Sequence, residues 1–348
     1  MNILIKSILF VFAQLYGVII KIRYWLYKHH FIGSTSFDVP VICIGNLSWG
    51  GTGKTPMIEY LIQLLQEQYH IGIISRGYKR NTTGFVLANL HHSYNDIGDE
   101  PLLLKYKYPN VAIGVGEERI VAIPNLIAMR PQTNLIIMDD GFQHLSVRPQ
   151  VNILLTTYQN PFWEDHLIPL GTLREYPRAK SRANIIIVTK CPKHINKTEQ
   201  QELIRQIQPS KNQSVFFSTI QYQPIYHLLN AEKNDTIQQN IVLITGIANA
   251  EPLVEHLSKQ FNITHLEYQD HHAFSLNELE RIKQTYPNQQ WITTEKDAVR
   301  LLAHKDWLIE NNIDLFIQPI AVEILHNQDD FKQLLIDYLE FFYGRNAS

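Results

Sequence analysis

A glycine-rich stretch near the start of the chain, VICIGNLSWGGTGKTPMIEYLIQLL (residues 41–65), constrains the fold more than any other part of the sequence. The apolar run before the glycines predicts a buried strand, and the apolar residues at helical spacing after Pro56 predict a helix. The glycines between them permit backbone conformations that side chains forbid. Successive N–H groups of such a turn hold phosphate oxygens at the positive end of a helix. The stretch therefore predicts a phosphate-binding loop.

The loop matches the pattern G-x-x-x-x-G-K-[ST] except at its first position, which is occupied by Ser48. In this pattern the lysine, here Lys54, reaches the β- and γ-phosphates of a nucleotide, and the hydroxyl of Thr55 binds Mg²⁺. The residues predicted to bind the nucleotide are Ser48, Trp49, Gly50, Gly51, Thr52, Gly53, Lys54 and Thr55.

Apolar runs alternate with helical patterns from residue 41 to about residue 220, and several runs are almost continuously apolar. This pattern predicts a doubly wound, mostly parallel α/β sheet that is covered on both faces. The expected strands are residues 41–44, 71–75, 111–115, 134–139, 152–156 and 184–189.

Two later runs, residues 214–226 and 315–324, are extended, and each contains a proline suited to an edge strand. A second alternating set of strands and helices lies between them. We expect the chain to leave the first domain through one run and to return through the other. The predicted parts are an N-terminal helix (1–30), a P-loop domain (31–222), a smaller α/β domain with linker strands (223–325) and a final helix that packs back on the first domain (326–348).

The bulk properties exclude some functions. A net charge of −2 provides no general basic field, so nucleic acid is not an expected partner. The two cysteines, Cys43 and Cys191, rule out a disulfide framework and fit a reducing compartment. Nothing in the sequence indicates an obligate protein partner.

The N-terminus favours contact with a membrane. Residues 7–20 are almost entirely apolar, and basic residues flank them at Lys6, Lys21, Arg23 and Lys28. This stretch is shorter than the roughly 20 residues that a spanning helix needs. We therefore expect a helix that lies in or dips into one leaflet, with its basic residues on anionic lipid. A buried core helix or a short anchor is the alternative.

Two acidic residues follow a buried run in LIIMDDGFQH (135–144). Asp139 and Asp140 would lie at the carboxyl end of a parallel strand, which is where open α/β sheets bind ligands. In P-loop proteins this position carries the carboxylate that holds Mg²⁺. Beside the predicted loop, the pair indicates a metal site rather than a turn.

Phosphoryl transfer to an alcohol also needs a base and positive groups around the phosphoryl. The candidate carboxylates are Asp99, Glu100 and Glu175, and the candidate cations are Arg76, Arg119, Arg174 and Arg178. Asp99 follows a glycine and could equally be a turn or cap residue. In the second domain the tandem His271 and His272 follow Asp270. Without further ligands at metal spacing we discount zinc; a histidine that sharpens a base and a merely polar loop are both open.

Nine motifs occur in order: GNLSWGGTGKTP, ISRGYKR, GDEP, DDGFQH, LREYPRAK, VTKC, LITGIANAEP, DHHAF and TTEKDAVRL. With them the chain resembles the tetraacyldisaccharide 4′-kinase family, the lipid A kinases of Gram-negative bacteria. The resemblance implies two α/β/α domains joined by a two-stranded linker. It also implies that ATP phosphorylates the 4′-hydroxyl of an acylated glucosamine disaccharide 1-phosphate, giving lipid IVA, at the cytoplasmic face of the inner membrane.

By the same motifs, Asp99 looks like the carboxylate that activates the sugar hydroxyl, and His271 looks like its partner, although the choice between His271 and His272 stays open. Lys54 and Arg119 would neutralise the charge on the phosphoryl group. The implied Mg²⁺ set is Thr55, Asp139, Asp140 and Glu175. From the residues alone, two rivals stay open: a P-loop NTPase that acts as a switch, and a kinase for another membrane-bound sugar or lipid.

Overall fold

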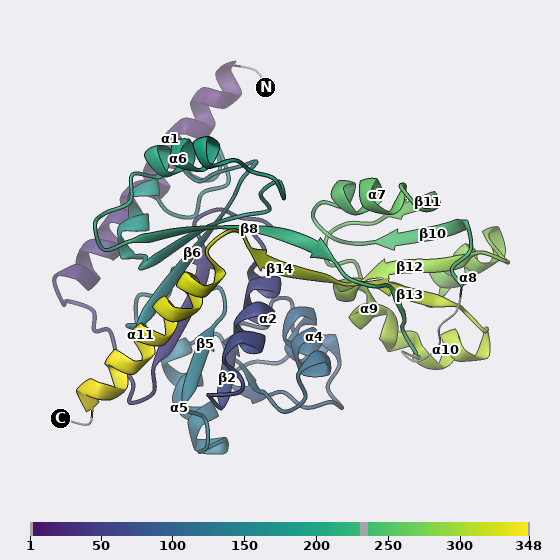
Figure 1. The fold of residues 1–348 in the computed structure, drawn as a ribbon, viewed down its shortest axis with the longest axis horizontal. Helices are drawn as coiled ribbons and strands as arrows, with labels where there is room; N and C mark the ends of the chain where they lie inside the picture. Colours follow the sequence, from purple (N-terminus) through teal and green to yellow (C-terminus); the bar gives the residue numbers. More distant parts are fainter. Residues whose placement is uncertain (1–2, 230–235, 347–348) are drawn as a thin grey trace.

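In a computed structural model that describes residues 3–229 and 236–346, the chain forms two α/β units, each built on its own sheet (Figure 1). The larger sheet has nine strands in the order β14-β8-β7-β6-β1-β5-β2-β4-β3. Their bounds are β1 (Val41–Asn46), β2 (Ile71–Ser75), β3 (Val86–Leu87), β4 (Ala112–Val115), β5 (Leu135–Met138), β6 (Val151–Thr157), β7 (Ile185–Thr189), β8 (Ser214–Tyr222) and β14 (Ile320–Ile324).

The strands between β8 and β4 are all parallel, whereas β3 and β14 at the two edges are antiparallel to their neighbours. In β1, Ile42 lies opposite Ile137 of β5 on one side and Val151 of β6 on the other. The prediction of a mostly parallel α/β sheet with a second, smaller α/β unit is confirmed.

Helices cover both faces of the larger sheet. The helices of this unit are α2 (Lys54–Leu65), α3 (Tyr94–Ile97), α4 (Asp99–Lys107), α5 (Arg119–Met129), α6 (Lys197–Ile207), α11 (Gln328–Asn346) and a 3₁₀ turn, η1 (Pro177–Arg182). Because side chains alternate along β1, Ile42 and Ile44 pack under α2, α4 and α11, whereas Cys43 packs under α5. The fully buried Phe331 and Leu335 of α11 join the first of these cores. Residues 347–348 of the predicted final helix lie outside the described residues.

The smaller sheet has the order β11-β10-β12-β13-β9. The bounds in this unit are β9 (Tyr226–His227), β10 (Asn240–Thr245), α7 (Glu251–Leu257), β11 (Asn262–Glu267), α8 (Leu276–Thr285), β12 (Gln290–Thr294), α9 (Glu295–Leu301), η2 (Leu302–His304), α10 (Lys305–Glu310) and β13 (Leu315–Gln318). Trp291 of β12, 1% exposed, lies in its core.

Two crossings connect the units, and β8 and β14 form an antiparallel pair there, with Tyr222 opposite Ile320 (Figure 1). Each of the two extended runs seen in the sequence is divided between the two sheets. Pro224 separates β8 from β9, and Pro319 separates β13 from β14. Since proline lacks an N–H, each run leaves one sheet's hydrogen-bond ladder at its proline and enters the other's.

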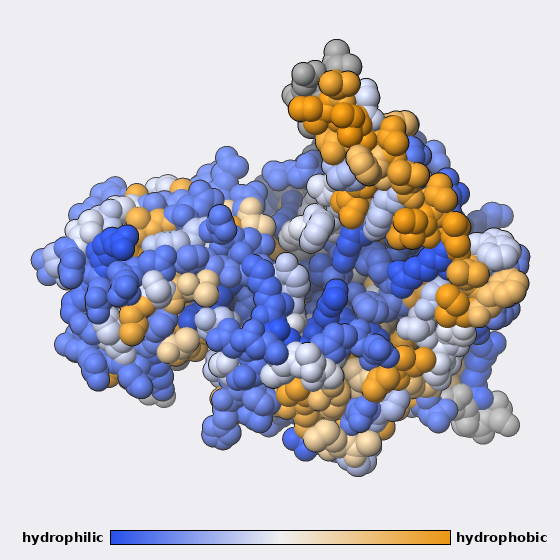
Figure 2. All heavy atoms as spheres, turned by 180° about the vertical axis from the view of Figure 1, so that it is seen from behind, coloured by the Kyte–Doolittle hydropathy of each residue, from blue (hydrophilic) through white to orange (hydrophobic). Residues whose placement is uncertain are grey.

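Helix α1 (Ile3–Lys28) is 26 residues long, so the predicted apolar segment covers only half of it. By length and composition, residues Leu4–Lys28 could cross a membrane. Of the 18-residue apolar stretch within them that supports this, 11% is buried against the rest of the protein. Figure 2 shows the hydrophobic surface gathered along this helix. Its exposed apolar residues include Leu4, Ile5, Ile8, Phe10, Val11, Phe12, Leu15, Val18, Ile19 and Ile22.

The other side of α1 is docked on the larger unit. Ala13 is 2% exposed. A side chain at Gly17 would overlap the Tyr176 hydroxyl, so the helix approaches the segment around Tyr176 closely there. The Tyr16 hydroxyl donates to the carbonyl oxygen of Arg174 at 2.8 Å. The helix therefore exposes one apolar side and packs its other side, which carries Ala13 and Gly17, against the larger unit.

An ion-pair triad joins the two units beside the linker. Lys107, at the end of α4, pairs with Glu59 of α2 and with Glu295 of α9, the latter at 2.6 Å. A cavity of about 320 Å³ is lined by the triad, by α2 and by linker residues that include Gln223 and Pro319. Burial raises the pKa of Glu59 to about 7, with Glu295 adding to the effect and Lys107 opposing it.

This raised pKa predicts a pH dependence of stability. The pKa of Glu59 is about 7 in the folded state against an ordinary value of 4.5, so the folded protein binds this proton more tightly than the unfolded chain does. The resulting contribution to the free energy of unfolding is fully present below about pH 4.5 and is lost as the pH rises through about 7. Because glutamine does not titrate, Glu59→Gln should remove that part of the slope. Urea unfolding followed by circular dichroism at a series of pH values measures it, with the exposed Glu67→Gln on the same segment as control. Parallel curves for wild type and Glu59→Gln would contradict the assignment.

Candidate active site

The glycine-rich segment forms the loop between β1 and α2. Gly50 and Gly53 have φ angles of 118° and 87°, which side chains rarely allow. The Thr189 hydroxyl donates to the Thr52 carbonyl oxygen at 2.9 Å, and the Trp49 N–H donates to the Thr172 carbonyl oxygen at 2.7 Å. The loop is therefore held from both sides, by the end of β7 and by the segment before Arg174.

Lys54 begins α2 and points toward the neighbouring strand end. Its Nζ lies 3.6 Å from Asp140 Oδ1 and 3.4 Å from Asn46 Oδ1. Asp140, at a φ of 47°, also receives two hydrogen bonds from Arg174, of 2.9 and 2.8 Å. Burial alone would raise the pKa of Asp140, but the Arg174 hydrogen bonds and the Lys54 charge outweigh it and hold that pKa below its usual value. Asp140 is thus an ionised carboxylate between two cations.

Asp139 differs from its neighbour because its buried carboxylate contacts no cationic side chain among the described residues. Its Oδ2 accepts from the Ser75 hydroxyl at 2.8 Å, while Oδ1 has no hydrogen-bond partner among the described residues. Burial and the negative charges of Glu100 and Asp140 raise the pKa of Asp139 to about 6. A buried carboxylate with one unpartnered oxygen fits a cation ligand, since a divalent ion would offset both penalties.

Glu175 was predicted to join these aspartates, but its contacts lie elsewhere. It accepts two hydrogen bonds from Arg182, at 2.7 and 3.0 Å, and is 5% exposed. Within residues 3–229 and 236–346, no group of three or more histidine, cysteine, aspartate or glutamate side chains is arranged to hold a metal ion. The described contacts therefore support Asp139 more directly than Glu175.

Arg119, predicted as a catalytic cation, is 1% exposed. Its guanidinium donates to the backbone carbonyl oxygens of Gly116 and of Asp139, the latter at 3.2 Å. Burial lowers its pKa, and the charges of Asp139 and Asp140 act in the opposite direction. These contacts hold the end of β5 and carry positive charge beneath the two aspartates.

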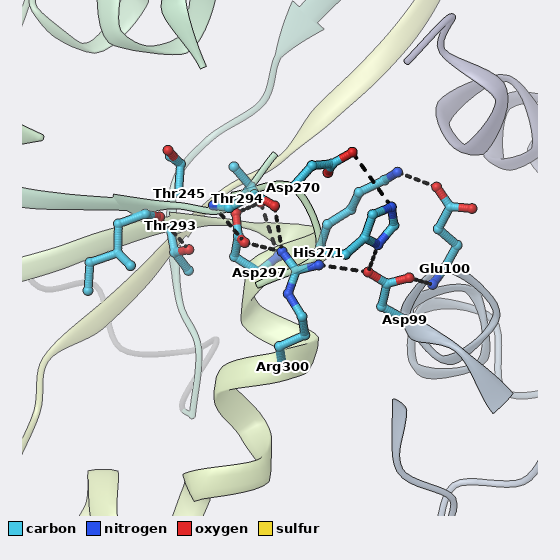
Figure 3. A network of polar contacts seen from close by, with 12 residues as sticks. Asp99, Glu100, Thr245, Asp270, His271, Thr293, Thr294, Asp297 and Arg300 are labelled. Carbon is cyan, nitrogen blue, oxygen red and sulfur yellow. Dashed lines mark hydrogen bonds and ion pairs between the residues drawn. The ribbon is translucent and has the colours of Figure 1, made fainter. Parts of the chain in front are cut away.

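Asp99 begins α4 and faces the smaller unit (Figure 3). Its Oδ2 lies 2.7 Å from His271 Nδ1 and also accepts from Arg300 Nη1 at 2.7 Å, and its Oδ1 accepts from the Glu100 N–H at 2.9 Å. Although burial acts to raise it, the hydrogen bond from His271 and the charges of His271, Arg300 and Lys296 lower the pKa of Asp99. The same hydrogen bond raises the pKa of His271.

The two adjacent histidines have different partners. His271, at a φ of 61°, turns toward Asp99, whereas His272 Nε2 lies 3.0 Å from Glu278 Oε1 within the smaller unit. Of the two, only His271 therefore contacts the candidate base across the units.

Two cations of α9 belong to this network but received no role from the sequence. Arg300, 2% exposed, donates to Asp99, Asp297 and the Gly246 carbonyl oxygen, and Lys296 pairs with Glu100. The motif TTEKDAVRL does contain a signal, since Lys296 and Arg300 stand four residues apart and share one face of a helix. Arg174, which clamps Asp140, was only one of several candidate cations.

The chain is similar to proteins of one known family over most of its length. The family model for tetraacyldisaccharide-1-P 4′-kinase matches residues 5–340. The tetraacyldisaccharide 4′-kinase of Bacteroides thetaiotaomicron is 40% identical over 347 residues, covering 94% of this chain and 91% of that protein. That of Flavobacterium johnsoniae is 40% identical over 341 residues, covering 97% and 98%.

A solved structure supports the fold. The structure titled "apo" form LpxK from Aquifex aeolicus in complex with ATP has a TM-score of 0.76 to this chain at 24% identity, and covers 96% of this chain and 99% of its own. With the family model and the relatives matched over nearly their whole lengths, this chain belongs to the tetraacyldisaccharide 4′-kinase family.

Proposed function

We propose that the protein transfers the γ-phosphoryl group of ATP to the 4′-hydroxyl of a tetraacylated glucosamine disaccharide 1-phosphate, giving lipid IVA. The observation that carries this proposal is the facing arrangement of two groups. A phosphate loop with Lys54 lies on the larger unit, and the Asp99–His271 pair lies where that unit meets the smaller one. Membership of the kinase family supports the same reaction.

In the proposed reaction, the 4′-oxygen forms a bond to the γ-phosphorus while the bond from that phosphorus to the bridging oxygen of ADP breaks. The hydroxyl proton passes to Asp99, and ADP leaves with the bonding electron pair. Because the transition state of phosphoryl transfer is loose, the proton can leave late, so an ionised carboxylate of low pKa suffices as acceptor. His271 and Arg300 hold the Asp99 carboxylate in one orientation through Oδ2.

Charge on the phosphoryl oxygens is neutralised by Lys54 and by a divalent ion. We propose Thr55, Asp139 and Asp140 as the residues that hold Mg²⁺, on the strength of the unpartnered Asp139 oxygen; Glu175 remains a weaker candidate. When bound, Mg²⁺ supplies positive charge at the phosphate oxygens. We propose that Arg119 acts as a positioning residue, because it binds the carbonyl oxygen of Asp139.

The site lies between two units that we assign to separate domains. We propose the boundaries 31–222 for the P-loop domain and 223–325 for the smaller domain, of which residues 230–235 lie outside the described residues. The paired strands β8 and β14 support a linker between them. Under this assignment one domain supplies the base and the other its histidine partner.

We further propose that α1 holds the enzyme on the cytoplasmic face of the inner membrane. An acylated substrate leaves a bilayer at a cost of about 0.8 kcal/mol per methylene group, so the enzyme has to reach the lipid. The outward apolar side of α1 supports this role.

Deletion of residues 1–28 should therefore move the protein from vesicles into solution while nucleotide binding is largely retained. Flotation with anionic phospholipid vesicles measures the partitioning, and calorimetry with ADP measures the binding. Lys211→Met, at an exposed loop position, is the control. If the truncated protein floats with vesicles as the full chain does, α1 is not the anchor.

The proposed function is tested by incubating the full-length protein in detergent with Mg-ATP and the disaccharide 1-phosphate. Mass spectrometry should find one added phosphate on the distal sugar. Hydrolysis of ATP without a phosphorylated lipid would favour an NTPase switch instead and would refute the proposal.

A further inference from the structure

The carboxyl end of β7 contacts the phosphate loop through residues that the reaction above does not use. The Thr189 hydroxyl donates to the Thr52 carbonyl oxygen at 2.9 Å and to the Thr156 carbonyl oxygen at 3.2 Å. Lys190 follows directly, in the left-handed backbone region at a φ of 57°. Its Nζ lies 4.0 Å from where a side chain at Gly51 would begin. The end of β7 thus fixes the loop and places a second lysine beside it.

This lysine has no counter-charge. Among residues 3–229 and 236–346, Lys190 has no hydrogen-bond or ion-pair partner, in contrast to Lys54 with Asp140 and Lys296 with Glu100. The side chain is exposed, but loss of water around its ammonium group, together with the like charge of Lys296, lowers its pKa. An anion beside Gly51 would supply the missing partner.

The strand order indicates which part of a nucleotide lies there. The larger sheet runs β7-β6-β1-β5. Asp139 and Asp140 follow β5, on one side of the loop strand, and Lys190 follows β7, on the other side. The γ-phosphate has to lie on the side of the acids and Asp99, since the acceptor alcohol is activated there. The α-phosphate and the nucleoside therefore extend along the loop toward β6 and β7.

We propose that Lys190 is a nucleotide-binding residue whose ammonium group binds the α-phosphate of a nucleoside di- or triphosphate held in the loop. The inference rests on the proposed function only in taking ATP as the bound nucleotide. In this arrangement Lys54 binds the reacting end of the phosphate chain, and Lys190 binds the end next to the nucleoside. Because the α-phosphate is common to substrate and product, this contact contributes equally to the binding of both.

Lys190→Gln removes the charge and keeps most of the side chain. Calorimetry with Mg-ADP and with a non-hydrolysable ATP analogue should show roughly tenfold weaker binding of both, the effect of losing one charge-assisted hydrogen bond. The KM for ATP should rise by a similar factor while kcat changes little. Lys193→Gln, three residues further along the same exposed segment, is the matched control and should bind both nucleotides as the wild type does.

Lys190→Arg tests whether charge is the cause, and it should bind both nucleotides nearly as tightly as the wild type. Unchanged affinity in Lys190→Gln would overturn the proposal. Weaker binding of the ATP analogue alone would also overturn it, since the contact would then lie at the γ end. If Lys190→Arg and Lys190→Gln weaken nucleotide binding equally and leave the melting curves unchanged, the charge of Lys190 is not the cause and the proposal is overturned. Failure of the wild type itself to bind either nucleotide would instead refute the proposed function.

Discussion

Asp99→Asn is expected to lower kcat by about 10²–10⁴-fold, the usual contribution of a general base, while the affinity for ATP stays nearly unchanged. The amide keeps the shape of the carboxylate but cannot take the hydroxyl proton. Asp99 lies at the first turn of α4 and not in the phosphate loop, so nucleotide binding does not depend on it directly. Steady-state kinetics with the lipid acceptor and calorimetry with an ATP analogue separate the two effects.

The control for this variant has to address folding, because Asp99 is 5% exposed and is contacted by Arg300, which is 2% exposed. Arg300 also pairs with Asp297, so its charge stays compensated in the variant. A melting curve by circular dichroism, with the exposed Asp38→Asn as a matched loss of charge, shows whether the fold persists. Wild-type turnover in a folded Asp99→Asn protein would remove Asp99 from the reaction.

Lys54→Met should damage both nucleotide affinity and turnover, with kcat reduced by about 10²–10³-fold, as for removal of one preorganised donor at a developing charge. Lys54 lies 3.6 Å from Asp140 at the end of the loop, and in the proposed reaction it contacts the phosphates in the ground state and in the transition state. The loss should exceed that of Lys190→Gln because, of the two lysines, we propose only Lys54 as a contact of the γ-phosphoryl oxygens.

The measurement for Lys54→Met is the same pair of assays, with Lys211→Met as the control at an exposed position. Normal affinity and normal turnover together would exclude Lys54 from the site. The two variants should be distinguishable by their kinetics, since Asp99→Asn should change kcat alone and Lys54→Met should change both kcat and KM.

The fold was largely predictable because its strands are short apolar runs in a regular order. The strand at residues 71–75 was placed with its correct bounds, and the others differ by one or two residues at their ends. The N-terminal helix was expected over residues 1–30, and α1 spans Ile3–Lys28; its apolar run is shorter than the helix because polar and aromatic residues after Ile20 interrupt the run without interrupting the helix. The division of each extended run between two sheets depends on tertiary pairing, which local composition does not encode.

The site was predictable only in part. The loop and the two aspartates follow from local patterns, because each lies at a strand end. The contact of Asp99 with His271 joins residues 172 positions apart, and only the family resemblance indicated it. Lys296 and Arg300 were missed as site residues, and Arg174 was only one of four candidate cations, because an arginine or lysine acquires its role from the carboxylate that packing places beside it.

The division of the Asp99–His271 pair between two sheets has a consequence for how the enzyme fails. A contact of 2.7 Å is broken by a relative shift of about 1 Å between the units, well before either core loses its packing. We therefore expect heating or mild denaturant to disturb the proposed catalytic pair first, at free energies below that of global unfolding. Inactivation would then precede the loss of secondary structure, and a shelf-life judged by circular dichroism would overstate the fraction of working enzyme.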